Sequence, residues 1–338
     1  MTCGRLVKWG IGAAMALLCV ITMSVGQASA EDISLRLGWK LTGYHLPFFW
    51  AKAKGYYAAE GLNVTIEPGA GSGKTVALIG GQHDDIGEAD YMLMAEAASK
   101  GMPVKGIFGI VQAGAWAVIS YADKPIKTPQ ELIGKSIAMT ADHKPLFDLL
   151  LAVNHIPEDK VHIRITNAAT RNTVFMNGKV DGFVSIIIGT PLNLVAMAKE
   201  GKGKPVYFMP FAKFGVSPLG EGVMANEAVI KKRPQMLTRF VRATARAFTE
   251  VMKPQNTNEA VDIAMKMSDT PPAQREAIKL GWLETLPRLR TANDEGKPVG
   301  WMSEKDWQKC VEILLKTKKI DKAFPAKTLY TNEFVPKS

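Results

Sequence analysis

Short stretches of alternating or continuous apolar residues recur along the first part of the chain, with helical patterns between them. Residues 33–39 alternate between apolar and polar positions, and residues 47–60 have a helical composition that ends at Gly61. The same pattern predicts further strands at 62–67, 85–87, 104–111 and 116–121, and further helices at 74–80 and 91–100. Strands and helices that alternate in this way are typical of an α/β fold.

The rhythm begins again near Lys127, although the sequence itself does not repeat. It predicts strands at 134–140, 161–166 and 180–188, and helices at 145–154, at 171–177 and after Pro191. Strands at 206–209 and 222–225 are expected to lead back toward the first half. The remainder is mainly helical, with helices predicted at 227–251, 259–267, 272–280 and 303–316. Ser303 and Asp306 have the spacing of a capping pair for the last of these helices.

The first 30 residues have the pattern of a cleaved export signal. Arg5 and Lys8 form a basic start, residues 10–25 are apolar, and Ala28-Ser29-Ala30 offers a site of small residues. The apolar stretch is shorter than the roughly 20 residues that a membrane span needs, which disfavours an uncleaved anchor. We therefore expect cleavage after Ala30 and a mature protein in the periplasm.

Composition narrows the function further. The chain has 42 Lys and Arg against 32 Asp and Glu, a formal net charge of +10, and the predicted signal removes two of these positive charges. The basic residues are scattered among acids along helices, without the clustering that nucleic-acid binding requires. Cys3 and Cys19 leave with the signal, so Cys310 alone remains and neither a disulfide nor a cysteine-rich zinc site can form. We expect a monomer without a metal or cofactor and with no nucleic-acid partner.

Several short motifs occur in a specific order along the chain. They are AKAKGYY at 51–57, EGLNV at 60–64, GSG at 71–73, GQ at 81–82, DIG at 85–87, PQELIGK at 129–135, NGKVDG at 177–182 and RP at 233–234. In these motifs the chain resembles the periplasmic solute-binding proteins of ABC importers. It is most similar to their nitrate/sulfonate/taurine and thiamine-pyrimidine-precursor-binding branch, over nearly all of residues 33–332.

The resemblance implies a type II periplasmic-binding-protein fold, with two α/β lobes, two crossover strands and a ligand cleft between the lobes. Lobe 1 would comprise residues 31–112 and 220–338, and lobe 2 would comprise residues 113–219. It also implies a receptor without catalytic activity, which closes on a small solute and delivers it to the permease of an ABC importer.

The GSGKT sequence at residues 71–75 invites a nucleotide-binding interpretation. A phosphate-binding P-loop needs a glycine five positions before Gly73, where the chain turns around the phosphate. Pro68 occupies that position, and proline offers no amide donor. We instead expect a turn whose amides at Gly71 and whose Ser72 hydroxyl face the ligand, with a plain connecting turn as the alternative.

Candidate ligand-binding residues of lobe 1 follow the predicted strand ends. They are Trp39, Tyr44, His45, Gly71, Ser72, Glu88 and Asp90. Trp39 could stack on a planar ligand or belong to the core, and Asp90 could contact the ligand or cap a helix. An acid near Glu88 favours a ligand that carries N–H donors or positive charge.

Candidates of lobe 2 lie at the predicted junctions between strands and helices, where hydrogen-bond donors converge. They are Trp116, Thr140, His143, Arg171, Asn172 and Thr190. His143 could bind a carboxylate or a heterocycle, and Arg171 could pair with an anion. Ordinary helix caps on the surface are the alternative for all of them.

No catalytic set is evident in the sequence. The five histidines lack metal-binding spacing, and no G-x-S-x-G motif occurs. An enzyme branch with the same fold makes the thiamine pyrimidine, but it carries a cysteine-rich motif that the mature chain lacks. The favoured ligand is a small planar heterocycle or aromatic acid. The alternatives are a small oxyanion such as sulfonate, taurine or nitrate, and a pyrimidine-synthesis enzyme.

Overall fold

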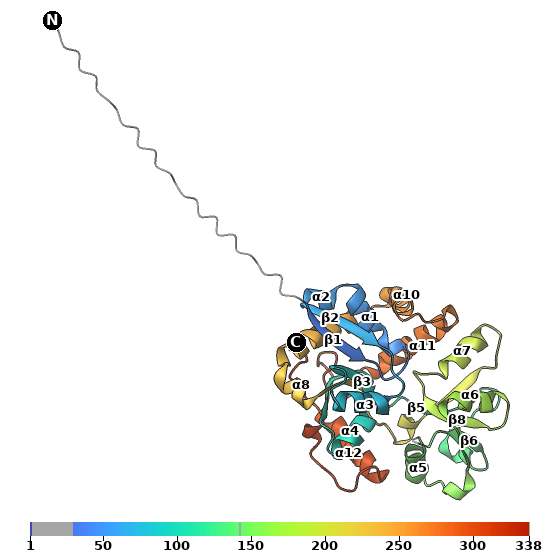
Figure 1. The fold of residues 1–338 in the computed structure, drawn as a ribbon. Coiled ribbons are helices and arrows are strands. Elements are labelled where there is room, and N and C mark those ends of the chain that lie inside the picture. The colour runs from blue at the N-terminus through green and yellow to red at the C-terminus, as the bar shows by residue number, and fades with distance from the viewer. Residues whose placement is uncertain (2–29, 142, 338) are drawn as a thin grey trace.

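The computed structural model describes Met1, residues 30–141 and residues 143–337, arranged as two α/β lobes side by side (Figure 1). The predicted export signal lies outside the described residues except for its two ends. Among the residues that the structure describes, no helix combines the length and the apolar character that crossing a membrane would need.

Lobe 1 is built on a five-stranded sheet with the order β2-β1-β3-β10-β4. Its strands are β1 (Glu31–Arg36), β2 (Leu62–Glu67), β3 (Ile86–Asp90), β4 (Val104–Gly109) and β10 (Glu221–Asn226). β1 runs parallel to β2 and β3, whereas β10 runs antiparallel to β3 and β4. The helices of this lobe are α1 (Leu46–Ala53), α2 (Tyr56–Ala59), α3 (Ser72–Gly80), α4 (Tyr91–Ser99), α8 (Glu227–Lys232), α9 (Pro234–Val251), α10 (Thr257–Met267), α11 (Arg275–Thr285) and α12 (Glu304–Lys316).

Lobe 2 repeats the plan with the strand order β7-β6-β8-β5-β9. Its strands are β5 (Trp116–Tyr121), β6 (Ser136–Met139), β7 (His162–Ile165), β8 (Gly182–Ile186) and β9 (Val206–Pro210), and its helices are α5 (Lys144–Val153), α6 (Ala168–Met176) and α7 (Leu192–Lys199). The strand predicted to lead back to lobe 1 is β9. It instead pairs with β5 at the edge of the lobe 2 sheet, so β10 is the strand that returns.

Burial explains why these segments form the elements that they do. Ile33 and Leu35 alternate inward along β1, whereas every residue of the central strand β3 is buried. On the helical side, Tyr57 stacks on Phe240 of α9 with ring centroids 5.3 Å apart. Apolar burial of this kind, about 25 cal/mol per Å², is the main stabilising contribution to the core.

Two predicted helices are divided, each for a local reason. The helix predicted at 47–60 breaks at Gly55, whose φ of +72° suits a residue without a side chain. The helix predicted at 227–251 breaks at Arg233, because the ring of Pro234 disfavours helical backbone in the residue before it.

Two further local predictions are corrected. The strand predicted at 85–87 extends to Asp90, so Glu88 lies within β3 and Asp90 ends it, rather than both following the strand. Ser303 precedes α12 but makes no side-chain capping bond. Asp306 accepts hydrogen bonds from Thr291 and Asn293 instead, each at 2.7 Å, so the tertiary contact replaces the local cap.

The two crossovers between the lobes lie against each other. The backbone N–H of Gly220 donates to Val111 O at 2.9 Å, and Ile110 N–H and Val111 N–H both donate to Glu221 O. Gly114 N–H donates to Ser217 Oγ at 3.1 Å. These bonds join the two crossover segments to each other.

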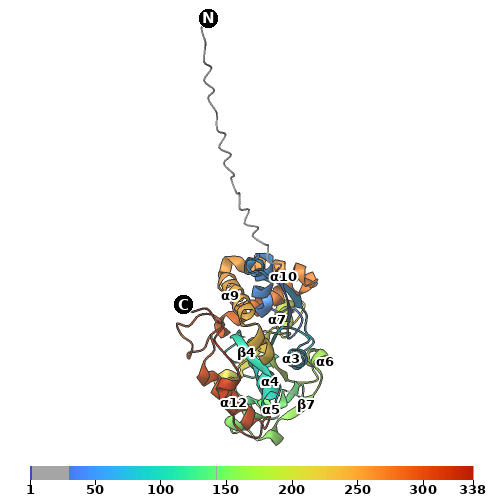
Figure 2. The same cartoon turned by 60° about the vertical axis from the view of Figure 1, so that its left-hand side comes forward.

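The lobes also touch on either side of this connection. Ile188 of lobe 2 packs into the core of lobe 1, and Ile313 of α12 packs into the core of lobe 2. Lys199 of α7 forms a 2.8 Å ion pair with Glu276 of α11. Turned by 60°, the molecule shows α12 beside α4 (Figure 2).

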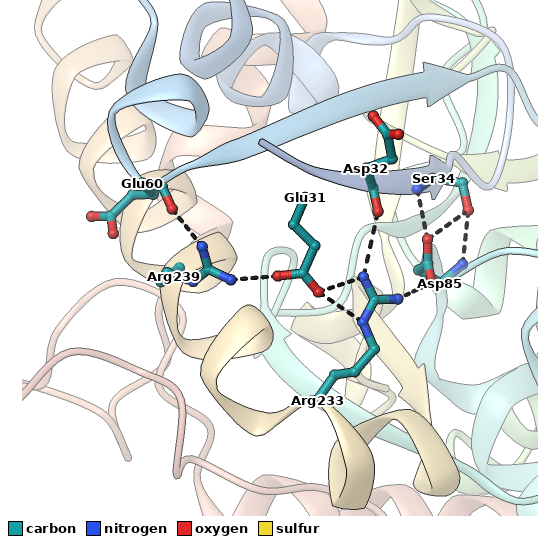
Figure 3. Close-up of polar contacts among 7 residues, drawn as sticks. All are labelled: Glu31, Asp32, Ser34, Glu60, Asp85, Arg233 and Arg239. Atoms are coloured by element: carbon teal, nitrogen blue, oxygen red, sulfur yellow. Dashed lines mark hydrogen bonds and ion pairs between the residues drawn. The ribbon is translucent and has the colours of Figure 1, made fainter. Parts of the chain in front are cut away.

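A polar network fixes the beginning of β1 to the helical part of lobe 1 (Figure 3). The Glu31 carboxylate accepts hydrogen bonds from Arg233 at 3.0 and 2.7 Å, and a further one from Arg239. Arg233 also pairs with Asp85, whose carboxylate accepts the backbone N–H of Ser34 at 2.9 Å. One arginine therefore links the first strand, the turn before β3 and the start of α9.

Candidate functional site

A cavity of about 280 Å³ lies between the two lobes. Lobe 1 surrounds it with the loop after β1, the start of α3, the junction of β3 and α4, the start of β10, and α12. Lobe 2 contributes the start of β5, the turn before α5, part of α6 and the end of β8. Strand ends and helix starts meet here from both sheets, which is where open α/β sheets bind ligands.

The predicted site residues fall into two sets. Those that line the cavity are Trp39, Tyr44, Gly71, Ser72, Asp90, Trp116, His143, Arg171 and Thr190. His45 and Glu88 are fully buried and do not line it, and neither do Thr140 and Asn172. The structure therefore brings most of the predicted residues together around one space, and contact with a ligand stays a prediction for each.

Three carboxyl groups gather on the lobe 1 side. Asp90 of β3 lies directly opposite Glu221 of β10 in the antiparallel register. Glu88 is two residues earlier on β3, so its side chain points to the same face of the sheet. Asp90 and Glu221 line the cavity while only 8% and 7% exposed. The floor of the site is therefore acidic.

Glu88 is held by two donors. Its Oε2 accepts Gly38 N–H at 2.8 Å and lies 2.9 Å from His45 Nε2. The backbone N–H of Thr42 points to His45 Nδ1 at 3.1 Å, so that nitrogen is an acceptor. This hydrogen-bond pattern assigns the imidazole proton to Nε2, which donates it to Glu88.

The neighbouring carboxyls titrate differently for identifiable reasons. Burial alone would raise the pKa of Glu88, but the hydrogen bonds from His45, Glu221 and Gly38 hold that pKa below its usual value. Burial raises the pKa of Glu221 well above its usual value, and the charges of Glu88 and Asp90 raise it further. Glu221 Oε2 is buried without a hydrogen-bond partner among the described residues. Glu221 is thus the floor group that holds a proton most readily.

The lobe 2 side of the cavity carries a positive charge, that of Arg171. Arg171 is 3% exposed, and its Nη2 donates to Ser185 Oγ at 2.9 Å. Its Nη1 lies 3.5 Å from His143 Nδ1, and its guanidinium lies 5.3 Å from the centre of the Phe183 ring. A buried, oriented guanidinium is suited to a carbonyl, carboxylate or other acceptor.

Aromatic side chains border the space between these two faces. Trp39 is 39% exposed at the cavity, so it does not belong to the core. Trp116 meets the His143 ring edge-on, with centroids 4.6 Å apart. Tyr44 packs edge-on against His45 at 4.3 Å, and burial raises the pKa of its hydroxyl. Indole and phenol rings of this kind suit a flat ligand.

The glycine-serine turn has a more limited role than predicted. α3 begins at Ser72, and Gly71 before it has a φ of +124°. The Gly71 amide donates to Gly38 O at 2.9 Å, so its N–H is used within lobe 1, although Gly71 lines the cavity. Ser72 still lines the cavity. Asp90, for its part, accepts Leu93 N–H at 3.1 Å, so it caps α4 in addition to lining the site.

Several residues that line the cavity were not predicted from the sequence. They are Gly38, Thr42, Met92, Leu93, Glu96, Pro145, Leu146, Ser185, Ile186, Glu221, Ile313, Leu314, Thr317 and Lys319. Glu221 could have been found, because it is an acid directly before a short apolar strand. No local signal marks the last four, since they reach the site through the packing of α12 on α4.

A profile of the family described as NMT1/THI5 like matches residues 42–257, more than half of the chain. The chain belongs to the NMT1/THI5-like family. This match, together with the relatives and solved structures described next, confirms the expected resemblance to periplasmic solute-binding proteins.

This NMT1/THI5-like chain is similar to both binding proteins and enzymes. It is 23% identical over 322 residues to the riboflavin-binding protein RibY of Chloroflexus aurantiacus, covering 92% of this chain and 88% of that protein. It is 20% identical over 301 residues to the formylaminopyrimidine-binding protein of Halalkalibacterium halodurans, covering 88% of each. It is 26% identical over 235 residues to the 4-amino-5-hydroxymethyl-2-methylpyrimidine phosphate synthase of Schizosaccharomyces pombe, covering 67% of each.

Solved structures agree on the fold of this NMT1/THI5-like protein. The periplasmic aliphatic sulphonate binding protein SsuA of Escherichia coli matches with a TM-score of 0.66 at 12% identity, covering 88% of this chain and 91% of that one. The periplasmic nitrate-binding protein NrtA of Synechocystis PCC 6803 matches with a TM-score of 0.63 at 14% identity, covering 90% and 87%. The predicted periplasmic-binding-protein fold with two α/β lobes is confirmed.

Proposed function

We propose that this protein is an exported solute receptor, which captures a small planar heterocycle between its lobes and delivers it to an ABC importer. The observation that carries the proposal is the interlobe cavity, with carboxyls on one side and Arg171 on the other. A solute that touches both lobes at once would favour their closed arrangement, which is how a two-lobe receptor senses its ligand.

The chemistry of the walls supports a heterocycle with N–H donors on one edge and acceptors on another. Asp90 and Glu221 would accept from amino or ring N–H groups, and Arg171 would donate to carbonyl or ring acceptors. Trp39 and Trp116 provide flat apolar surfaces beside these groups. An anion without donors would leave the acidic floor uncompensated, which costs free energy when the site closes.

The relatives support the same class. Two of them are named for binding riboflavin and formylaminopyrimidine, which are nitrogen heterocycles. The sulphonate- and nitrate-binding structures share only the fold at 12% and 14% identity, so they add little about the ligand. Periplasmic proteins among these neighbours are consistent with export, as is the predicted signal at residues 1–30.

An enzyme is the second candidate function, because the Schizosaccharomyces pombe relative is named as a pyrimidine phosphate synthase. Against it, Cys310 is the sole cysteine of residues 30–338, and it is fully buried with a thiol pKa raised by that burial. Such a thiol is unreactive. The carboxyls, the guanidinium and the aromatic rings that line the cavity can all bind a solute, and they suit a receptor that releases its ligand unchanged.

A binding screen tests the proposal. The purified protein would be heated with riboflavin, 4-amino-5-hydroxymethyl-2-methylpyrimidine, an alkanesulfonate or nitrate, and hits would be titrated calorimetrically. A ligand at about 100 times its Kd should add roughly 2.7 kcal/mol to the free energy of unfolding. We expect a heterocycle to raise the melting temperature and to be recovered unchanged. No response to any heterocycle would overturn the proposal, and a converted product would favour the enzyme.

A further inference from the structure

The side of the cavity formed by α4 and α12, the α4–α12 wall, is lined mainly by apolar side chains, unlike the acidic floor and the Arg171 side. The two helices lie side by side (Figure 2), with Cys310 Sγ 3.2 Å from Met92 Sδ. Farther along α4 and just beyond the end of α12, Lys319 Nζ lies 3.7 Å from Glu96 Oε2. The wall therefore extends from Asp90, which caps α4 at the floor, to the Glu96–Lys319 ion pair at its other end.

Between those charged ends the wall is apolar. Met92 and Leu93 of α4 line the cavity and are only partly buried, and Leu314 of α12 stands behind them. Leu146 of lobe 2 lines the cavity as well and is partly buried. These side chains would remove an apolar part of a ligand from water, at about 25 cal/mol per Å².

The volume argues for a ligand larger than a single ring. An engineered apolar cavity of about 150 Å³ accommodates benzene. The cavity here, at about 280 Å³, is nearly twice as large. A single six-membered ring at the acidic floor would occupy only part of this volume. A second or third fused ring would fill that space.

α12 also lies outside the part of the chain that the family profile covers. The profile ends at residue 257, whereas α12 spans Glu304–Lys316. The helix is nevertheless fixed in place, since Trp307 stacks on Tyr330 with ring centroids 5.4 Å apart and is fully buried. A helix held in this way presents its side of the cavity as a rigid wall.

We propose that the α4–α12 wall determines specificity, selecting a heterocycle that carries a fused apolar carbocycle over a single-ring heterocycle. The polar edge of the ligand faces Asp90, Glu221 and Arg171, and its apolar end packs against Leu93 and Leu146. This inference rests on the proposed receptor function, and it adds the part of the ligand that the polar groups do not recognise.

Calorimetric titration with two probes tests the proposal. Lumichrome has three fused rings with an apolar dimethylbenzene end, and 4-amino-5-hydroxymethyl-2-methylpyrimidine has one ring. We expect the wild-type protein to bind lumichrome about 10- to 100-fold more tightly, the range that added apolar contacts give in a fitted pocket. Leu93→Asn and Leu146→Asn should each remove most of that preference while leaving the pyrimidine affinity nearly unchanged. Leu283→Asn, on an exposed position of α11, should change neither affinity.

Each other outcome contradicts the proposal in a distinct way. Equal or tighter binding of the pyrimidine by the wild-type protein would overturn the specificity wall but leave the receptor function intact. A parallel loss of both probes in the Leu93 and Leu146 variants would also overturn it, because it would indicate a general structural role. Binding of neither probe by the wild-type protein would overturn the receptor function together with this inference.

Discussion

Asp90 and Glu221 lie directly opposite each other on the antiparallel strands β3 and β10, and both reach the floor of the interlobe cavity. Like charges at such positions destabilise a sheet, and burial adds to the cost of ionising both. Burial and the charges of Glu88 and Asp90 raise the pKa of Glu221, so Glu221 is the group that relieves this repulsion most readily by taking up a proton. Two of the backbone hydrogen bonds that join the crossovers, from Ile110 and Val111, are accepted by Glu221 O. The acidic floor therefore adjoins the connection between the lobes.

Replacing Glu221 by Gln should therefore change how stability depends on pH. A carboxyl whose pKa is raised by folding favours the folded state while protonated, and it lowers the free energy of unfolding as pH rises above its ordinary value of 4.5. Between pH 5 and pH 8 we expect the free energy of unfolding of the wild-type protein to fall relative to that of Glu221→Gln, by about 1.4 kcal/mol for each unit by which folding raises the pKa. Urea unfolding at both pH values measures this.

A matched carboxyl serves as the control for that measurement. Glu312 is an exposed residue of α12, and Glu312→Gln should follow the wild-type protein at both pH values. Parallel stability curves for the wild-type protein and Glu221→Gln would show that Glu221 is ionised in the folded protein throughout this range. Such a result would contradict the assignment of the proton to Glu221.

Arg171 should contribute to affinity through its orientation as well as its charge. Ser185 and the Phe183 ring fix the guanidinium, so Arg171→Lys keeps the charge but loses the fork that can reach two acceptors. We expect Arg171→Lys to weaken binding of a heterocycle that carries carbonyl groups by about tenfold or more, as for a lost charged hydrogen bond of roughly 1.5–3 kcal/mol. Calorimetric titration measures the change. Arg164→Lys, exposed on β7, should bind as the wild-type protein does, and equal affinities for all three would remove Arg171 from the site.

The sequence predicted the elements well where local signals surround them. β2 runs from Leu62 to Glu67 as predicted, since Gly61 and Pro68 flank an alternating strand. β5 likewise coincides with the predicted 116–121. The strand at 85–87 was predicted too short, because Glu88 and Asp90 are polar and only tertiary contacts, such as the Gly38 amide on Glu88, permit their burial.

The candidate site was predictable only in part, for a similar reason. Residues that follow strands, such as Trp39 after β1 and His143 after β6, lie at strand ends of the two sheets, and the strand pattern alone could mark them as candidates. Leu314 and Lys319 are more than 200 residues away from Asp90 along the chain, and no spacing rule connects them. Only the packing of α12 on α4 places them beside the cavity.

Ile313 should help to keep the lobes closed. It belongs to α12 of lobe 1 but is 5% exposed within the core of lobe 2, so the lobes cannot part without exposing it. Truncation to Ala should lower the population of the closed arrangement, since removing a buried isoleucine side chain costs about 2–5 kcal/mol. Small-angle X-ray scattering should show a larger radius of gyration for Ile313→Ala than for the wild-type protein.

Val311→Ala is the matched control, because Val311 is equally buried on the same helix but packs within lobe 1. An equal radius for both variants would exclude Ile313 as a closure contact.

Glu31 should stabilise the protein in a way that acid removes. Burial raises the pKa of Glu31, but the hydrogen bonds and charges of Arg233 and Arg239 outweigh it, and the pKa is lowered (Figure 3). A lowered carboxyl pKa contributes stability that is present above the ordinary value of 4.5 and is lost as pH falls through the folded-state pKa. Because the side chain is 35% exposed, solvent screening limits the effect of Glu31→Gln on the free energy of unfolding to about 1 kcal/mol at pH 7.

Urea unfolding at pH 7 and pH 3 should show this difference at the higher pH and little at the lower. Asp32→Asn, on the exposed neighbouring residue, should show a smaller difference, and a Glu31→Gln effect that persisted at pH 3 would mean that the network acts without the charge of Glu31.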